Sequence, residues 1–374
     1  MVILIAYLLL LIAVSLAAYR PGFRNIFSTQ RSLPWFLAGF SVFMINFDNI
    51  NILSKMGIVA EHGYSGLWIF YTGVLGAGLL PIVFAPLWSR LKLMTDNQLI
   101  LIRFSGRPAK ILHLFRAVYV GYLVVALFIA QVFIGLSKLL IVFFDVTYTQ
   151  SFLIITLLLA FIIAKNSLRL KVRTDLLNGI IYLTAFALGA WFVLQQYGGI
   201  AEVYTRLNAN HAAQVSLFPK SIGQSTFETL PTLLVYFFVQ WWSVNVLDGG
   251  APEAQRFMNV KTPFGAFRAA FLPLILFSIV FVFHSFVIDT GILMLSDHPE
   301  QLPLINGRSD TEAGFITMYT SAMPKELATL IFIAFLAGFI SFLESFINWG
   351  SGFVVVDLFK TYVYKKQTDR FYAR

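Results

Sequence analysis

The chain has 374 residues, of which 58% are hydrophobic and 12% are charged, and its formal net charge at pH 7 is +9. A soluble domain carries about 25% charged residues, so this composition excludes an ordinary soluble protein and indicates one that crosses a membrane several times. The absence of cysteine excludes disulfides, thiolate metal sites and cysteine nucleophiles. The net charge fits basic loops beside a lipid bilayer, so we expect no nucleic-acid partner.

About nine apolar stretches are long enough to span roughly 30 Å of hydrocarbon, and they predict an all-α, polytopic membrane helix bundle. They lie near residues 1–19, 34–54, 64–89, 112–143, 150–165, 174–196, 226–247, 264–294 and 325–358. The last is too long for one span, so we expect it to continue past the membrane. The first has no basic leading region and no small-residue cleavage site before Arg20, so it is interpreted as a mature helix and not as a signal peptide.

Basic residues are concentrated in every second loop between these stretches. The loops after the first, third, fifth and seventh stretches and the C-terminal tail are rich in them, with Lys171 assigned to the loop after the fifth and Arg256 to the loop after the seventh. The intervening loops carry few. The positive-inside rule therefore predicts an N-terminus outside and a C-terminus in the cytoplasm, in a plasma membrane or bacterial inner membrane.

The second stretch contains "FMINFDNINIL" at 43–53. Its polar side chains point to all sides of a regular helix and are Asn46, Asp48, Asn49 and Asn51. An ionised Asp at the bilayer centre costs at least about 2.5 kcal/mol, whereas irregular backbone is tolerated where it lines a watery cavity. We expect the helix to be broken here, so that its freed carbonyls and helix ends bind an ion or a solute. A straight helix whose polar groups bond to neighbouring helices is the alternative.

A second polar interruption lies in the seventh stretch, in "FFVQWWSVNVLDGG" at 237–250. Gln240 and Asn245 indicate a cavity wall, and Trp241 beside them offers a stacking face. An interfacial aromatic belt is the alternative interpretation of the tryptophans. The following "GGAPEAQR" at 249–256 is interpreted as a structural cytoplasmic turn.

The ninth stretch contains "AGFISFLESFINWGSGFVVVD" at 337–357. A narrow stripe of small and polar residues falls within about 120° on a helical wheel and comprises Gly338, Ser341, Glu344, Ser345 and Asn348. Hydroxyls and a carboxylate are hard oxygen donors that suit Na⁺ or H⁺ rather than a soft metal. A stripe that only serves close helix packing is the alternative.

Two further titratable residues lie within the predicted helices. Asp175 opens the sixth stretch in "VRTDLLNG", where it either caps the helix or has a functional role. His284 in "FVFHSF" is interpreted as a hydrogen-bonded packing residue and not as a base. The sequence has no Ser-His-Asp pairing and no phosphate loop, so we expect no enzyme.

Five segments together resemble the sodium:solute symporter family, which includes sodium–sugar, sodium–proline and sodium–sialic acid transporters. They occur in family order across nearly the whole chain: "RSLPWFLAGFSVFMINF" at 31–47, "LKLMTDNQLILIRFSGRP" at 91–108, "RTDLLNG" at 173–179, "EAQRFMNVK" at 253–261 and "SFLESFINWGSGFVVVDLFK" at 341–360. Each segment alone is a modest signal, but five in order are a strong one.

The resemblance implies a leucine-transporter-like fold, in which a leading helix precedes two inverted five-helix repeats. On this chain the leading helix is 1–19, the first repeat is 34–196 and an incomplete second repeat is 226–358, all in a single transmembrane domain. The family breaks the first helix of each repeat, here the second and seventh stretches. The sequence ends where the family has two further helices, so we expect either a fragment or a degenerate member.

The resemblance also implies a sodium site between the second and ninth helices. Its ligands would be the backbone carbonyls of Met44, Phe47 and Gly338 and the hydroxyl of Ser341. The family's second hydroxyl falls on Phe342, which cannot coordinate an ion. Asp175 matches an acidic position near a second ion site in some members, and the stripe residues Glu344 and Ser345 would extend the ligand set.

These features lead to the hypothesis of a cation-coupled secondary transporter that works by alternating access, with Na⁺ as the coupling ion and H⁺ as an alternative carried by Asp48 or Glu344. The solute would be small and polar, namely a sugar, an amino acid or a carboxylate. Its expected contacts are Asn46, Asp48, Asn49, Asn51, Gln240, Trp241 and Asn245. A non-transporting sensor-type or inactive member is the second hypothesis. An intramembrane enzyme is the weakest, since only His284 lies at depth.

Overall fold

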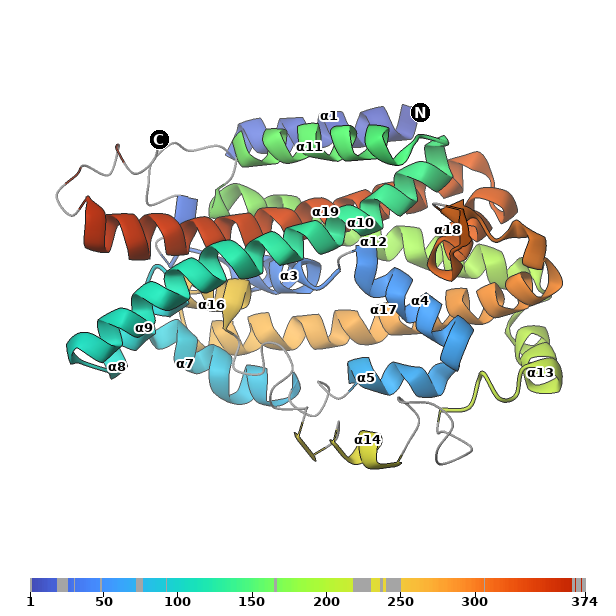
Figure 1. The fold of residues 1–374 in the computed structure, drawn as a ribbon, viewed down its shortest axis with the longest axis horizontal. Helices are drawn as coiled ribbons and strands as arrows, with labels where there is room; N and C mark the ends of the chain where they lie inside the picture. The colour runs from blue at the N-terminus through green and yellow to red at the C-terminus, as the bar shows by residue number, and fades with distance from the viewer. Residues whose placement is uncertain are drawn as a thin grey trace.

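The computed structural model describes residues 2–18, 26–29, 31–47, 49–71, 77–91, 93–164, 167–217, 230–235, 238–239, 250–305, 307–364, 367 and 371. These residues form the all-α helix bundle that the composition predicts (Figure 1). A short antiparallel hairpin accompanies the helices and consists of β1 (Leu304–Ile305) and β2 (Arg308–Ser309).

Within the described residues, four continuous helical segments are long and apolar enough to cross a membrane. They are α9 (Gly106–Val118) with η4 (Tyr119–Val124) and α10 (Val125–Phe144); α12 (Leu168–Gln196); α17 (Pro263–Asp297); and α19 (Lys325–Gly352) with the π-helical η7 (Phe353–Val363). They contain the predicted stretches 112–143, 174–196, 264–294 and 325–358, and the last segment ends at Val363. The polytopic membrane character of the chain is therefore confirmed.

The second predicted stretch is divided into two helices, as the polar cluster at 46–51 led us to expect. Helix α3 (Trp35–Ile45) ends before Asn46, and helix α4 (Asn49–His62) begins three residues later (Figure 1). Asn46 has φ −93° and ψ 0°, and its backbone N–H donates to the Phe43 carbonyl oxygen over 3.2 Å. The α-helical hydrogen-bond ladder thus stops at this point, which leaves later backbone groups outside it.

The remaining described helices are two apolar ones and a set of short connectors. The apolar ones are α1 (Val2–Ala18) and α11 (Tyr148–Ala164). The connectors are η1 (Tyr64–Leu67), α5 (Trp68–Tyr71), η2 (Leu80–Phe84), α7 (Ala85–Arg90), η3 (Asp96–Gln98), α8 (Leu99–Arg103), α13 (Ile200–Asn210), α14 (Leu230–Val235), α16 (Ala251–Asn259), η6 (Pro299–Gln301) and α18 (Thr311–Ala322).

The segment 249–256 was expected to be a turn, and that prediction is wrong. Helix α16 begins at Ala251, with Pro252 in its first turn, and its residues from Pro252 to Asn259 are all buried. The end of α16 is tied to the start of α3 by a bridge between Leu33 and Val260, in which the Leu33 N–H donates to the Asn259 carbonyl oxygen over 3.2 Å. This short helix is therefore part of the protein interior.

Helix α19 lies at the centre of the bundle. Of its most apolar window, 83% of the residues are buried, compared with 22% for the segment Gly106–Phe144. It packs most extensively against α12, which also contacts α3 and α17. Because α19 is surrounded by protein, polar side chains on it can be satisfied by neighbouring helices rather than exposed to lipid.

Candidate functional site

Helix α12 carries one polar face that is buried against the rest of the bundle. Lys171, Thr174, Asp175 and Asn178 recur at intervals of three and four residues, and none is more than 2% exposed. Ser167 caps the helix, because its side chain accepts the Leu170 N–H. The helix thus begins seven residues before Asp175, which excludes a capping role for that residue.

The predicted stripe on α19 faces this polar side of α12. Gly338, Ser341, Ser345 and Asn348 are buried, and Glu344 reaches the Thr174 hydroxyl, which donates to Glu344 Oε2 over 3.4 Å. The Asn178 amide donates to Ser341 Oγ over 2.9 Å. The two helices are therefore joined by polar contacts along the stripe.

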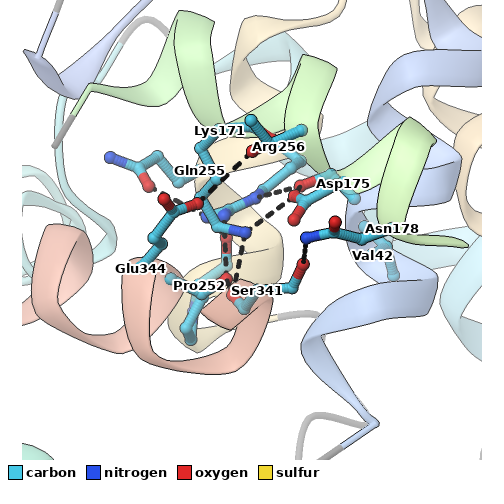
Figure 2. A network of polar contacts seen from close by, with 12 residues as sticks. Val42, Lys171, Asp175, Asn178, Pro252, Gln255, Arg256, Ser341 and Glu344 are labelled. Carbon is cyan, nitrogen blue, oxygen red and sulfur yellow. Dashed lines mark hydrogen bonds and ion pairs between the residues drawn. The ribbon is translucent and has the colours of Figure 1, made fainter. Parts of the chain in front are cut away.

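A lysine ammonium bridges α12 and α19 in the middle of this network (Figure 2). Lys171 Nζ donates to Asp175 Oδ2 over 2.7 Å and to the Ser341 carbonyl oxygen over 3.0 Å. The side chain is 1% exposed. The prediction that Lys171 lies in a basic cytoplasmic loop is therefore wrong, because α12 starts at Leu168 and directs this residue inward.

A guanidinium from α16 forms the other cationic part of the network. Arg256 Nε donates to Ser41 Oγ of α3 over 3.1 Å, and Nη2 donates to Ser345 Oγ of α19 over 3.2 Å. Nη1 donates to the Pro252 carbonyl oxygen and to Gln255 Oε1. Arg256 was also expected in an exposed loop, and it is instead fully buried.

Burial lowers the pKa of Arg256 to about 10, and the nearby carboxylates of Asp175, Glu253 and Glu344 act in the opposite direction. At neutral pH the guanidinium is therefore still charged. A buried charge needs hydrogen bonds and opposite charges close by, and Arg256 donates four hydrogen bonds and lies near three carboxylates.

Asp175 is the acidic centre of the network. Its Oδ2 accepts from the Ser41 hydroxyl as well as from Lys171. Its Oδ1 has no hydrogen-bond partner among the described residues. The two cations Lys171 and Arg256 thus lie among three carboxylates, those of Asp175, Glu253 and Glu344.

The predicted sodium ligands lie close to this network. The backbone carbonyl oxygen of Phe47, just after α3, sits so close to Gly338 that a Cβ at residue 338 would collide with it. Ser341 follows one turn later on the stripe, and Met44 is fully buried on α3. The structure thus brings the helix interruption and the α19 stripe into direct contact, and the set of ion ligands stays a prediction.

Phe342 belongs to an aromatic cluster. Its ring centroid lies 4.2 Å from that of Phe346 and 6.2 Å from that of Phe128 on α10. The side chain is 5% exposed. A hydrophobic contact between α19 and α10 therefore stands at the position where the family resemblance implies a second hydroxyl.

The expected solute contacts are only partly within the described residues. Asn46 is exposed, and its Nδ2 donates to the Val42 carbonyl oxygen over 3.0 Å. Asn49 and Asn51 belong to α4, but their side chains, like Asp48, Gln240, Trp241 and Asn245, lie outside the described residues. The solute set therefore stays a prediction.

An aromatic group that the sequence did not suggest lies beside the interruption. The ring of Phe47 packs 4.6 Å from that of Tyr182 on α12 and 5.4 Å from that of Phe277 on α17. The Tyr182 hydroxyl is 3.2 Å from His284 Nε2. His284 is thus a hydrogen-bonded packing residue, as expected, and the interruption is held in place by rings from two other helices.

Comparisons with known proteins agree with this geometry. The model of the sodium:solute symporter family matches residues 26–373. A curated relative, the sodium/sialic acid symporter NanT of Aliivibrio fischeri, is 24% identical over 360 residues, which are 92% of this chain and 66% of that protein. The chain thus spans just under two thirds of that relative's length.

A solved structure of a Na⁺-coupled sialic acid symporter, in a substrate-bound outward-open state, shares the fold. It superposes with a TM-score of 0.81 at 19% sequence identity, and the match covers 100% of this chain and 76% of that one. The transporter fold expected from the sequence is therefore confirmed.

Proposed function

The chain belongs to the sodium:solute symporter family, and on that premise we propose that it carries out Na⁺-coupled symport of a small polar organic solute by alternating access. It is thus proposed to be a transporter and not an enzyme. Its position would be the plasma membrane or bacterial inner membrane, with the N-terminus outside and the C-terminus in the cytoplasm. The division into a leading helix at 1–19 and repeats at 34–196 and 226–358 is part of the same proposal.

The observation that carries this proposal is the contact between the helix interruption and the α19 stripe. The Phe47 carbonyl oxygen lies against Gly338, where no side chain intervenes, and Ser341 offers a hydroxyl one turn away. Carbonyl and hydroxyl oxygens are the hard ligands that Na⁺ prefers. We assign the coupling ion to Phe47, Gly338 and Ser341 together with the Met44 carbonyl.

This arrangement would couple the ion to the solute through the interrupted helix. Na⁺ held between α19 and the end of α3 would fix the backbone at residues 46–48. Polar residues lie within this segment and directly after it, so a fixed backbone would orient them towards the solute. They are Asn46, Asp48, Asn49 and Asn51, and the seventh stretch would contribute Gln240, Trp241 and Asn245. Bound Na⁺ would then raise the affinity for the solute, and linkage requires that the bound solute raise the affinity for Na⁺ by the same factor.

Because its similar proteins are named as sialic acid symporters, a carboxylated sugar of that kind is the first solute to test. The purified chain would be reconstituted into proteoliposomes, and uptake of labelled sialic acid, proline and glucose would be measured. We expect one of these solutes to accumulate when Na⁺ is high outside, and to stop accumulating when choline replaces Na⁺.

Two matched variants locate the ion. Ser341→Ala should raise the Na⁺ concentration needed for half-maximal uptake. Ser278→Ala should not, because Ser278 is exposed and its hydroxyl donates to the Leu274 carbonyl oxygen of its own helix, α17. Equal uptake with and without a Na⁺ gradient would contradict Na⁺ coupling, and accumulation driven by a proton gradient would identify H⁺ as the coupling ion instead.

A further inference from the structure

The polar network beside the proposed Na⁺ ligands already contains a cation at its centre. Lys171 Nζ lies between Asp175 Oδ2, at 2.7 Å, and the Ser341 carbonyl oxygen, at 3.0 Å (Figure 2). A carboxylate from α12 and a backbone carbonyl from α19 are the kind of oxygen pair that would otherwise hold a metal ion. The ammonium thus occupies the position between the two helices that a second cation would need.

The Lys171 ammonium and its carboxylate partner belong to the same helix. Lys171 precedes Asp175 by four residues on the same helix, so the two side chains lie one above the other on one face of α12. Any movement of α12 relative to α19 therefore carries the ammonium and its carboxylate together. The contact that can open is the one with the Ser341 carbonyl oxygen.

Two cations already lie beside this position. Arg256 lies near the carboxylates of Asp175, Glu253 and Glu344, and the hydroxyl oxygens of Ser41 and Ser345 already accept from it. Of the two Asp175 oxygens, Oδ2 accepts from Lys171 and Ser41, whereas Oδ1 has no hydrogen-bond partner among the described residues. One oxygen beside two fixed cations cannot hold Na⁺, because the repulsion is weakly screened in a buried site.

We propose that the Lys171 ammonium is a built-in cation that permanently occupies the position between Asp175 and Ser341, so that this position takes no Na⁺. The inference rests on the proposed function and refines it, since it confines Na⁺ to Met44, Phe47, Gly338 and the Ser341 hydroxyl. A tethered cation stays with the protein during the transport cycle, so it contributes no ion to the coupling stoichiometry.

The test is the number of Na⁺ ions bound by the purified full chain in detergent, measured with ²²Na⁺, together with the melting temperature in NaCl and in choline chloride of equal ionic strength. Lys171→Ala removes the ammonium and leaves Asp175 facing an open space, and we expect it to bind one more Na⁺ per chain than the wild type. Its melting temperature should rise more with Na⁺ than that of the wild type.

Three controls make the result specific to this position. Lys325→Ala removes an exposed lysine at the start of α19 and should leave the Na⁺ count unchanged. Lys171→Ala/Asp175→Asn removes both charges and should lose the extra Na⁺. Asp175→Asn alone should bind as many Na⁺ ions as the wild type, because the wild-type carboxylate holds a lysine and not a metal.

The proposal is overturned if folded Lys171→Ala binds no additional Na⁺, or if the double variant keeps it. Should Lys171→Ala fail to fold, Asp175→Asn decides: an unchanged Na⁺ count supports the built-in cation, and the loss of one Na⁺ refutes it. A wild type that binds no Na⁺ would refute the proposed Na⁺ coupling. The difference in bound Na⁺ between the wild type and Lys171→Ala would still test the role of Lys171.

Discussion

At the scale of single residues, Gly338 is the position where the smallest change should have the largest effect on ion binding. A Cβ at residue 338 would collide with the Phe47 carbonyl oxygen, so Gly338→Ala should push the helix interruption away from α19. We expect the apparent Na⁺ affinity in uptake assays to fall on the order of tenfold, which corresponds to about 1.4 kcal/mol.

Gly78→Ala is the matched control for that substitution. A Cβ at residue 78 would meet nothing within 4 Å, so uptake should keep its wild-type dependence on Na⁺. If Gly338→Ala also keeps that dependence, the contact between Phe47 and Gly338 is a packing contact and does not shape an ion site.

Phe342 is the residue at which this chain departs from the family resemblance, and its neighbours determine what a hydroxyl there would do. Phe342→Ser removes a ring that packs against Phe346 and Phe128, so the loss of stability should be near the roughly 3–5 kcal/mol typical of Phe→Ala in a core. We expect no tighter Na⁺ binding. Isothermal calorimetry and thermal unfolding measure the two effects, with Phe342→Leu as the milder control, and a clear gain in Na⁺ affinity would show that residue 342 borders the ion.

The stripe on α19 could be predicted from the sequence, whereas its cationic neighbours could not. Hydroxyls and a carboxylate at helical spacing stand out in this segment, because most of the other residues between 337 and 357 are apolar. Lys171 and Arg256 were missed because a basic residue next to an apolar stretch is usually in a cytoplasmic loop. The signal that could have found Lys171 is its spacing from Thr174, Asp175 and Asn178, which continues the polar face of α12 by one turn.

At the scale of elements, the short helix α16 should contribute strongly to stability because one side chain joins it to two others. Arg256 links α16 to Ser41 of α3 and to Ser345 of α19. Arg256→Gln would remove these two hydrogen bonds from buried hydroxyls and take a positive charge away from the nearby carboxylates, and the loss of such buried hydrogen bonds typically costs about 1–3 kcal/mol. We therefore expect a markedly lower melting temperature in detergent.

Arg206→Gln provides the comparison. Arg206 lies on α13, is 47% exposed and pairs with Glu202 four residues earlier. Exposed helix pairs of this kind contribute about 0.3–0.5 kcal/mol, so its melting temperature should hardly change. Similar melting temperatures for the two variants would mean that the buried network around Arg256 adds little stability.

The interruption between α3 and α4 could be predicted from the sequence, but α16 could not. Polar side chains around the whole circumference of an apolar helix have no favourable arrangement in a bilayer unless the helix breaks. Helix α16 gives no such signal, because its buried residues include Glu253, Gln255, Arg256 and Asn259, which look like an exposed loop. Its burial follows from tertiary contacts with α3, α7 and α19, which hydropathy does not encode.

At the scale of the whole molecule, an ion pair lies near each end of the long axis. Helices α8 and α9 lie at one end and α13 and α18 at the other (Figure 1). At the first end Arg116 pairs with Asp96 over 2.8 Å, and at the second Lys138 pairs with Asp310 over 2.8 Å. The interruption between α3 and α4 lies between these ends, which is where transporters of this architecture place their substrates.

The orientation of this axis in the membrane is the last prediction, and the absence of cysteine makes it directly measurable. The end that carries α8 and α9 exposes Arg103, Arg107 and Lys110, so the positive-inside rule places it in the cytoplasm. Ser105→Cys at that end should react with a membrane-impermeant maleimide only after cells are permeabilised. Asn208→Cys, on the exposed side of α13 at the opposite end, should react in intact cells. The unsubstituted chain has no thiol and gives the background. The reverse labelling pattern would mean that the N-terminus lies inside, and it would refute the orientation proposed here while leaving the ion site untouched.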